Sequence, residues 1–143
     1  MRDQSLNLEW APTGAPEVKM AAEKQFENEI KKFLNNQNCW NLKYWGGGGY
    51  TKSGIPDLLI CCNGRFIAVE VKAKSGTPSV LQLITLKRIT ESGGIAVLLY
   101  PDDFGRFKEL IKSIWMGFEN ETGQHKMYFM SKIEQELLRR TQR

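Results

Sequence analysis

An Asn-Gly pair, Asn63-Gly64, separates two apolar runs, Leu58–Cys62 and Phe66–Val71. Asn-Gly between such runs is the strongest short-range signal for a β-hairpin, because a two-residue type I′ turn needs a positive φ at both central residues. If this pair forms the turn, Cys62 pairs with Arg65, and every other cross-strand pair follows from that one. The sequence therefore predicts both the hairpin and its register.

Both strands of this hairpin carry apolar side chains on both faces. Strands that are apolar on both sides are covered on both sides, so we expect helices above and below the sheet. The alternation places Leu58, Ile60, Ile67, Val69 and Val71 on one face, and Leu59, Cys61, Phe66 and Ala68 on the other.

The remaining elements follow from apolar periodicity and from capping residues. A strand, a helix and a further strand after the hairpin imply a parallel crossover, so the predicted class is α/β, with a mixed sheet between helices in the order α-β-β-β-α-β-α. We expect a helix over 17–35, a strand over 39–45, a helix with Thr77 as N-cap and Pro78 in its first turn that ends at Gly93-Gly94, a strand over 95–100, and a helix from Asp102 or Asp103 to about Met116.

A chain of 143 residues is long enough for one well-cored domain. We expect an irregular N-terminal arm over residues 1–16 and the domain itself over residues 17–118. Residues 119–143 are expected to form an extension packed on the same domain, with a polar loop that holds His125, a short apolar piece over Met127–Met130 and a final charged helix.

Composition excludes several classes of site. The three cysteines form no CxxC pair and His125 is the only histidine, so we expect neither a structural zinc site nor a disulfide framework. The net charge of +4 suits a polyanionic partner. No apolar run approaches the length of a membrane span, so we expect a soluble protein of the cytoplasm with no membrane partner.

The hairpin register brings two carboxylates together. It places Asp57 across from Glu70, with Lys72 two residues further along the same face. Facing carboxylates at the end of a buried hairpin repel each other unless a cation lies between them. Mg²⁺ prefers oxygen ligands and needs only one or two carboxylates, so we predict a magnesium site formed by Asp57, Glu70 and the backbone carbonyl of Val71. The alternative is a salt bridge at the strand end.

Such a site suits the hydrolysis of a phosphodiester, which needs charge compensation at the phosphoryl oxygens and an activated water. Lys72 could orient that water, favour its deprotonated form or stabilise the charge of the transition state. Glu27, on the first helix, could serve as an outer-shell or second-metal ligand, although it could instead pair with a neighbouring lysine. Gln82 could hydrogen-bond the nucleophile or the phosphate, or lie on the surface.

Basic side chains concentrate around these residues, as phosphate binding requires. We predict DNA contacts from Lys43, Lys52, Ser53 and Lys74; the alternative is that the lysines are solubilising surface residues. The glycines of 46–49 form either a mobile loop or a close backbone approach to a phosphate. A nucleotide-binding P-loop is excluded, because Thr51 precedes Lys52 where a glycine is needed.

At this point the motifs resemble those of a known nuclease superfamily. Gly54-Ile-Pro-Asp57 followed by Glu70-Val-Lys72 resembles the PD-(D/E)xK motif. Together with Lys52-Ser53, Leu81-Gln82 and Gly93-Gly94, it is similar to the VRR-NUC branch, which is found in phages and fused to a repair nuclease in eukaryotes. The resemblance covers about residues 20–115.

This resemblance implies a restriction-endonuclease-like fold, Mg²⁺ or Mn²⁺ as cofactor, and a stand-alone phage-type nuclease that acts in the cytoplasm of a bacterial host. It implies that Asp57 and Glu70 bind metal, that Lys72 is catalytic, that Gln82 belongs to the site, and that Glu27 matches the helix glutamate, with Glu23 and Glu29 as alternatives. It further implies a homodimer similar to Holliday junction resolvases, acting on four-way DNA.

Three functional hypotheses remain. The first is a metal-dependent endodeoxyribonuclease that is selective for branched DNA. The second is a catalytically silent module that only binds DNA junctions, although the complete Asp-Glu-Lys set favours catalysis. The third is a nuclease subunit of a larger restriction or repair complex, which would stay inactive without its partner.

Overall fold

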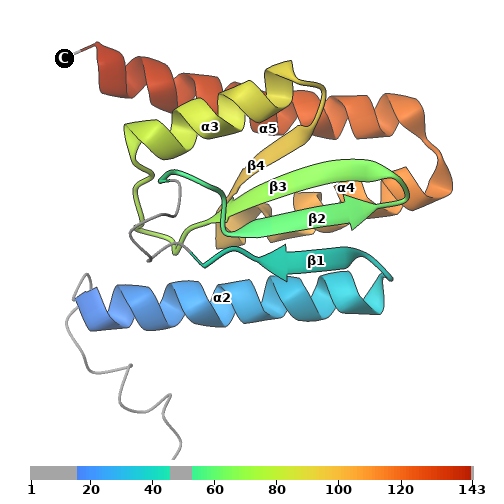
Figure 1. The fold of residues 1–143 in the computed structure, drawn as a ribbon, viewed down its shortest axis with the longest axis horizontal. Coiled ribbons are helices and arrows are strands. Elements are labelled where there is room, and N and C mark those ends of the chain that lie inside the picture. The colour runs from blue at the N-terminus through green and yellow to red at the C-terminus, as the bar shows by residue number, and fades with distance from the viewer. Residues whose placement is uncertain (1–15, 46–52, 143) are drawn as a thin grey trace, which may run out of the picture.

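The computed structural model of this chain describes residues 16–45 and 53–142. A four-stranded sheet lies at its centre, with its strands in chain order across the sheet (Figure 1). The first three strands are antiparallel neighbours, and the fourth runs parallel to the third. This mixed sheet confirms the predicted α/β class. Its strands are β1 (Trp40–Lys43), β2 (Leu58–Cys62), β3 (Arg65–Val71) and β4 (Ile95–Leu99).

The hairpin has the predicted turn and register. Asn63 and Gly64 have φ angles of 47° and 80°, as a type I′ turn requires. Cys62 pairs with Arg65, and the ladder continues to the pair of Leu58 with Val69. The Asn-Gly pair was therefore sufficient to define which side chains of the two strands face each other.

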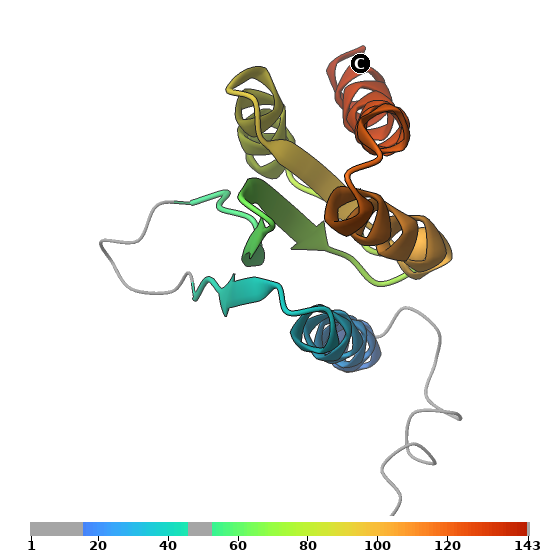
Figure 2. The same cartoon turned by 90° about the vertical axis from the view of Figure 1, so that its right-hand side faces the viewer.

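Helices cover both faces of the sheet, as expected from strands that are apolar on both sides (Figure 2). On one face, α2 (Pro16–Asn36) and α4 (Phe104–Met116) pack against the larger core cluster, which includes Ile60, Val69 and Val97. On the other face, α3 (Val80–Glu91) and α5 (Glu119–Thr141) enclose a smaller cluster around Ala96 and Leu98. This second face is covered only in part, because Cys61 and Phe66 remain exposed.

The start of α3 differs from the prediction. The N-cap is Ser79 rather than Thr77, so Pro78 precedes the helix instead of opening it. The hydroxyl of Ser79 accepts a hydrogen bond from the backbone N–H of Gln82, and the side-chain oxygen of Gln82 accepts one from the backbone N–H of Ser79. This capping box satisfies two N–H groups at once, which Thr77 does not do. The predicted end of the helix at Gly93 is confirmed, with φ of 96°.

The entry to α4 also differs. A short 3₁₀ turn, η1 (Pro101–Asp103), precedes the helix, and the side chain of Asp103 makes no capping hydrogen bond. Its carboxylate instead accepts hydrogen bonds from the hydroxyl of Tyr128 and the ammonium of Lys132 on α5. The aspartate that was expected to cap α4 therefore anchors α5 beside it.

The C-terminal segment is one continuous helix rather than a loop, an apolar piece and a helix. Phe129 and Ile133 are buried one turn apart and attach α5 to both core clusters. His125 lies on this helix, with Nδ1 3.3 Å from a guanidinium nitrogen of Arg106. Packing against α3, α4 and β4, and not local periodicity, therefore determines this element.

Some expectations concern residues outside the described ranges, namely residues 1–15 of the N-terminal arm, the glycines of 46–49, and Lys52. The three cysteine thiols are free. Within 16–45 and 53–142, no helix is long and apolar enough to cross a membrane.

Candidate active site

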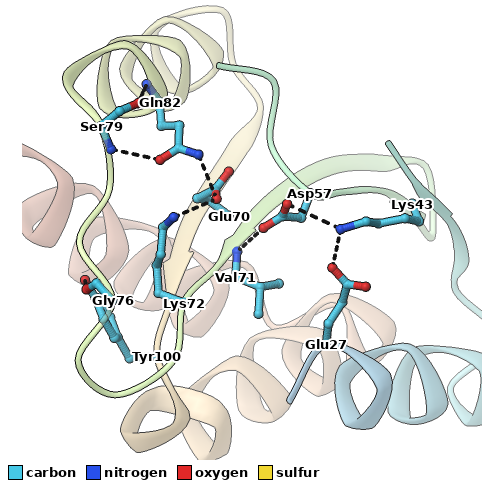
Figure 3. A network of polar contacts seen from close by, with 10 residues as sticks. All are labelled: Glu27, Lys43, Asp57, Glu70, Val71, Lys72, Gly76, Ser79, Gln82 and Tyr100. Atoms are coloured by element: carbon cyan, nitrogen blue, oxygen red, sulfur yellow. Dashed lines mark hydrogen bonds and ion pairs between the residues drawn. The ribbon is translucent and has the colours of Figure 1, made fainter. Parts of the chain in front are cut away.

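Four elements and the segment before β2 bring the predicted site residues together at one end of the sheet (Figure 3). Helix α2 carries Glu27, and β1 ends with Lys43. The segment before β2 carries Asp57, and α3 carries Gln82 in its first turn. Glu70 lies near the end of β3, and Lys72 follows that strand directly.

Asp57 precedes the first paired residue of β2 by one position. It is therefore not paired with Glu70 in the ladder, although the register alone predicted that pair. Its backbone carbonyl accepts a hydrogen bond of 2.8 Å from the amide of Tyr44. Its side chain reaches back to the hairpin, where Oδ2 accepts a hydrogen bond of 2.9 Å from the backbone N–H of Val71. The carboxylate is therefore fixed beside β3, next to Glu70.

Gly54 brings the segment that leads to Asp57 close to α3. Its φ is 79°, and a Cβ at this position would lie 2.7 Å from Cγ of Leu81. Only glycine has both the conformation and the space at this point. Glycine is therefore required at this position of the Gly54-Ile-Pro-Asp57 motif, because the segment passes close to the helix that carries Gln82.

Glu70 is a buried carboxyl group with one unsatisfied oxygen. Only 2% of the residue is exposed. Its Oε2 accepts a hydrogen bond of 3.1 Å from the amide of Gln82 and lies 3.4 Å from the ammonium of Lys72. Its Oε1 is buried and has no hydrogen-bond partner among the residues that the structure describes. Such an atom is costly unless a ligand satisfies it.

The environment of Glu70 disfavours its charged form. Burial raises the pKa of this carboxyl group to about 8, and the negative charge of Asp57 adds to the effect. The ammonium of Lys72 acts in the opposite direction but does not outweigh them. Because a carboxyl group must ionise to bind a cation, a proton competes with a cation for Glu70.

Lys72 is positioned by the loop that follows β3. Its Cδ passes close to Gly76, where an added Cβ would lie 3.3 Å from it. The hydroxyl of Tyr100 donates a hydrogen bond of 2.8 Å to the carbonyl of Gly76 and ties this loop to the end of β4. The lysine side chain is 13% exposed, and its ammonium lies 3.4 Å from Oε2 of Glu70.

The side chain of Gln82 both caps α3 and contacts Glu70. Its oxygen closes the capping box with Ser79, which leaves its amide nitrogen free to donate to Glu70. The predicted position of Gln82 in the site therefore has a geometric basis. The start of α3 determines which oxygen of Glu70 stays available.

Glu27 and Asp57 are joined by Lys43, which was predicted as a DNA contact. The Lys43 ammonium lies 2.5 Å from Oε1 of Glu27 and 3.4 Å from Oδ1 of Asp57. Burial alone would lower the pKa of Lys43, but the hydrogen bond to Glu27 and the two negative charges raise it above 10.5. Lys43 therefore lies inside the carboxylate cluster, and its contact with DNA stays a prediction.

The structure disfavours Glu29 as the helix glutamate of the site and does not decide between Glu23 and Glu27. Glu27 is buried and contacts Lys43, whereas Glu29 is exposed. Partial burial raises the pKa of Glu23, and the charges of Lys72 and Asp57 act on this group as well. Glu23 and Glu27 both lie on the side of α2 that faces the site.

Of the other predicted DNA contacts, Ser53 and Lys74 belong to the described ranges, and both lie at the surface. Ser53 is exposed and borders an apolar hollow beside α3. Lys74 is exposed and borders a second hollow, between the loop after β3 and α5, which Lys132 and Arg139 also line. Trp45 is 75% exposed, and the centre of its ring lies 5.5 Å from the Lys43 ammonium.

A divalent cation fits the donor set of this site. Within the described residues, no group of three or more His, Cys, Asp and Glu side chains could hold a metal ion. Mg²⁺ nevertheless needs only one or two carboxylates and retains several waters. Asp57 and Glu70 provide these carboxylates, and the unsatisfied Oε1 of Glu70 is the type of atom that a hard cation satisfies.

Comparison with known proteins agrees with this geometry. The archaeal Holliday junction resolvase (Hjc) family matches residues 19–99, more than half of the chain. The chain belongs to this family. No curated protein and no solved structure was found to match it.

Membership of the Hjc family supports the restriction-endonuclease-like fold and implies a nuclease, that is, a hydrolase of phosphodiester bonds. The matched range contains the site residues from Glu27 to Gln82 and ends just before Tyr100. This boundary is the end of β4, so α4 and α5 lie beyond the Hjc match. The finer assignment to the VRR-NUC branch stays a prediction.

Several residues that shape the site were not found by sequence reasoning. The bridging position of Lys43 and the tether from Tyr100 depend on which elements meet in space, so no local pattern indicates them. The amide of Val71 contacts Asp57, whereas the sequence indicated a role only for its carbonyl. Ser79 could have been found, because Ser79 and Gln82 have the S-x-x-Q spacing of a capping box.

Proposed function

We propose that this protein is an Mg²⁺-dependent endodeoxyribonuclease that is selective for branched DNA, including four-way junctions. The observation that carries the proposal is the buried Glu70, whose unsatisfied Oε1 lies in a site shared with Asp57 and Lys72. A buried carboxyl group with a raised pKa beside a second carboxylate and an ammonium is typical of an active site. Family membership supports the same reaction class.

In this proposal, Asp57, Glu70 and the backbone carbonyl of Val71 hold the metal ion, and Mn²⁺ can replace Mg²⁺ because both accept oxygen ligands. When bound, the divalent cation supplies Lewis acidity at the scissile phosphate. The N–H of Val71 fixes the orientation of Asp57, and the amide of Gln82 fixes that of Glu70.

Lys72 acts in catalysis without binding the metal ion. Its ammonium is a donor with three N–H groups, of which one is directed to Glu70. The others can orient the attacking water and stabilise the negative charge that develops on the phosphate. Tyr100 and Gly76 keep the lysine in this place.

DNA binding is assigned to the exposed basic side chains beside the site. Lys74 is one described example, in the loop after β3, and Lys52 and Ser53 belong to the segment before Asp57. Such contacts go to phosphates and hold the backbone in register without reading sequence. The resemblance of the Lys52–Asp57 motif also supports the assignment to the stand-alone VRR-NUC branch.

The proposed homodimer uses the uncovered face of the sheet. Trp40 and Phe66 both pair with Cys61, so they lie in one row across the strands, and they are 60% and 48% exposed. Next to Phe66, the exposed Leu81 and Ile84 of α3 line a hollow of about 500 Å³. Exposed apolar side chains gathered on one face in this way are typical of a protein interface. Sedimentation at micromolar concentration should show a dimer for the wild type and a monomer for Phe66→Glu, whereas Met127→Glu, on the exposed side of α5, should remain dimeric.

The nuclease activity is tested with end-labelled four-way junction and linear duplex in the presence of Mg²⁺. We expect the wild type to cut the junction faster than the duplex, and Lys72→Ala to bind the junction but cut it at least about 100-fold more slowly. Lys87→Ala, at another exposed lysine, is the matched control and should cut normally. Binding without cleavage by the wild type would favour the silent module, and cleavage only after addition of a cell extract would favour a subunit of a larger complex.

A further inference from the structure

Lys43 lies between two carboxylates beside the proposed metal site. The carboxylates are those of Glu27 on α2 and Asp57 before β2, and the lysine side chain is only 20% exposed (Figure 3). In a site with two metal ions, a carboxylate commonly bridges the ions or holds the second one. Here the gap between these two carboxylates is already filled by a cation of the chain itself.

Both oxygens of Glu27 face ammonium groups. Oε1 is 2.5 Å from Lys43, and Oε2 is 3.9 Å from Lys31, one helical turn away. In contrast, Glu70 has an oxygen with no partner among the described residues. The two glutamates therefore differ in what they can offer to a metal ion. Glu70 has a free ligand atom, whereas the charge of Glu27 is compensated within the protein.

The charge of Lys43 also opposes a second cation. A divalent ion placed near Glu27 would meet an ammonium at close range, in a partly buried environment where repulsion between like charges is stronger than in water. An ammonium, that of Lys72, also lies near Glu70, but it contacts Oε2 and leaves Oε1 without a partner among the described residues, whereas both oxygens of Glu27 face lysines.

We propose that Lys43 takes the place of a second metal ion, so that the site binds a single divalent cation at Asp57 and Glu70. This inference rests on the proposed metal-dependent function. Lys43 is then a positioning residue, which compensates Glu27 and the outer oxygen of Asp57 and holds α2 against β1 in the presence and absence of metal. Glu27 acts through Lys43 and is not a metal ligand.

The test counts the Mn²⁺ ions bound by the full-length chain, with free Mn²⁺ measured by electron paramagnetic resonance. We expect about one ion per chain for the wild type and about two for Lys43→Met, which frees Glu27 and Asp57. The double variant Lys43→Met/Glu27→Gln should return to about one ion. Lys31→Met is the matched control, because it removes the same charge beside Glu27 without opening the gap, and it should bind about one ion.

Two bound ions in the wild type, or one in a folded Lys43→Met protein, would overturn the inference and leave the metal-dependent function intact. No bound ion in the wild type would overturn both. Lys43→Gln serves as the second variant if Lys43→Met does not give the circular dichroism spectrum of a folded protein. A wild-type count of two ions is enough to overturn the inference without either variant, whereas support for the role of Lys43 requires the second ion in the variant.

Discussion

The backbone N–H of Val71 donates a hydrogen bond of 2.9 Å to Oδ2 of Asp57. This contact joins the segment before β2 to the strand that carries Glu70, so the two carboxylates of the site are held by one strand end. It also explains how Asp57 can belong to the site without being a member of the ladder. Asp57 therefore has a structural role, through the hydrogen bond from Val71, that can be tested separately from its proposed role as a metal ligand.

Replacement of Asp57 should therefore have two separable effects. Asp57→Asn retains an oxygen that can accept from Val71, so its free energy of unfolding should change by less than about 1 kcal/mol. Asp57→Ala leaves this buried N–H without a partner and should cost about 1–3 kcal/mol. Both variants should lose junction cleavage by at least about 100-fold. Urea denaturation of the two variants checks the prediction, and equal destabilisation would show that the Val71 contact is not important.

The raised pKa of Glu70 predicts how stability depends on pH in the absence of metal. Between the ordinary pKa of 4.5 and the folded-state value of about 8, the folded protein retains a proton that the unfolded chain releases. The free energy of unfolding should therefore fall as pH rises through this window, by up to about 1.4 kcal/mol per pH unit from this group. Above about pH 8 the contribution is constant.

Glu70→Gln is the matched control for this prediction, because it keeps the shape of the side chain and removes its titration. Denaturation in EDTA from pH 5 to pH 9 should show a shallower decline for this variant than for the wild type. Identical pH profiles would contradict the assignment of the raised pKa to Glu70.

Variants of Gln82 and Ser79 should distinguish the effect of helix capping from the effect of the contact with Glu70. Both Gln82→Ala and Ser79→Ala break the capping box and should lower the free energy of unfolding by about 1 kcal/mol. Only Gln82→Ala also removes the hydrogen bond to Oε2 of Glu70, so only this variant should weaken Mn²⁺ binding, by about 10-fold or more. Calorimetric titration of the two variants makes the comparison. An equal loss of affinity would mean that the cap, and not the contact with Glu70, matters for the metal.

The sequence predicted those parts of the fold that depend on local chemistry. Asn63-Gly64 determined the hairpin register, and this register brought Asp57, Glu70 and Lys72 to the same end of the sheet. It could not predict α5 as one helix, because the apolar residues of that segment are sparse and become informative only when Phe129 and Ile133 pack on the rest of the domain. Likewise, the position of Lys43 depends on two partners that are distant in sequence.

Anomalous diffraction from a crystal soaked in Mn²⁺ would show whether Asp57 and Glu70 share one divalent cation. We expect a manganese peak within about 2.5 Å of Oε1 of Glu70 and of an oxygen of Asp57. A peak that contacts neither carboxylate, or no peak at a saturating concentration of Mn²⁺, would contradict this expectation.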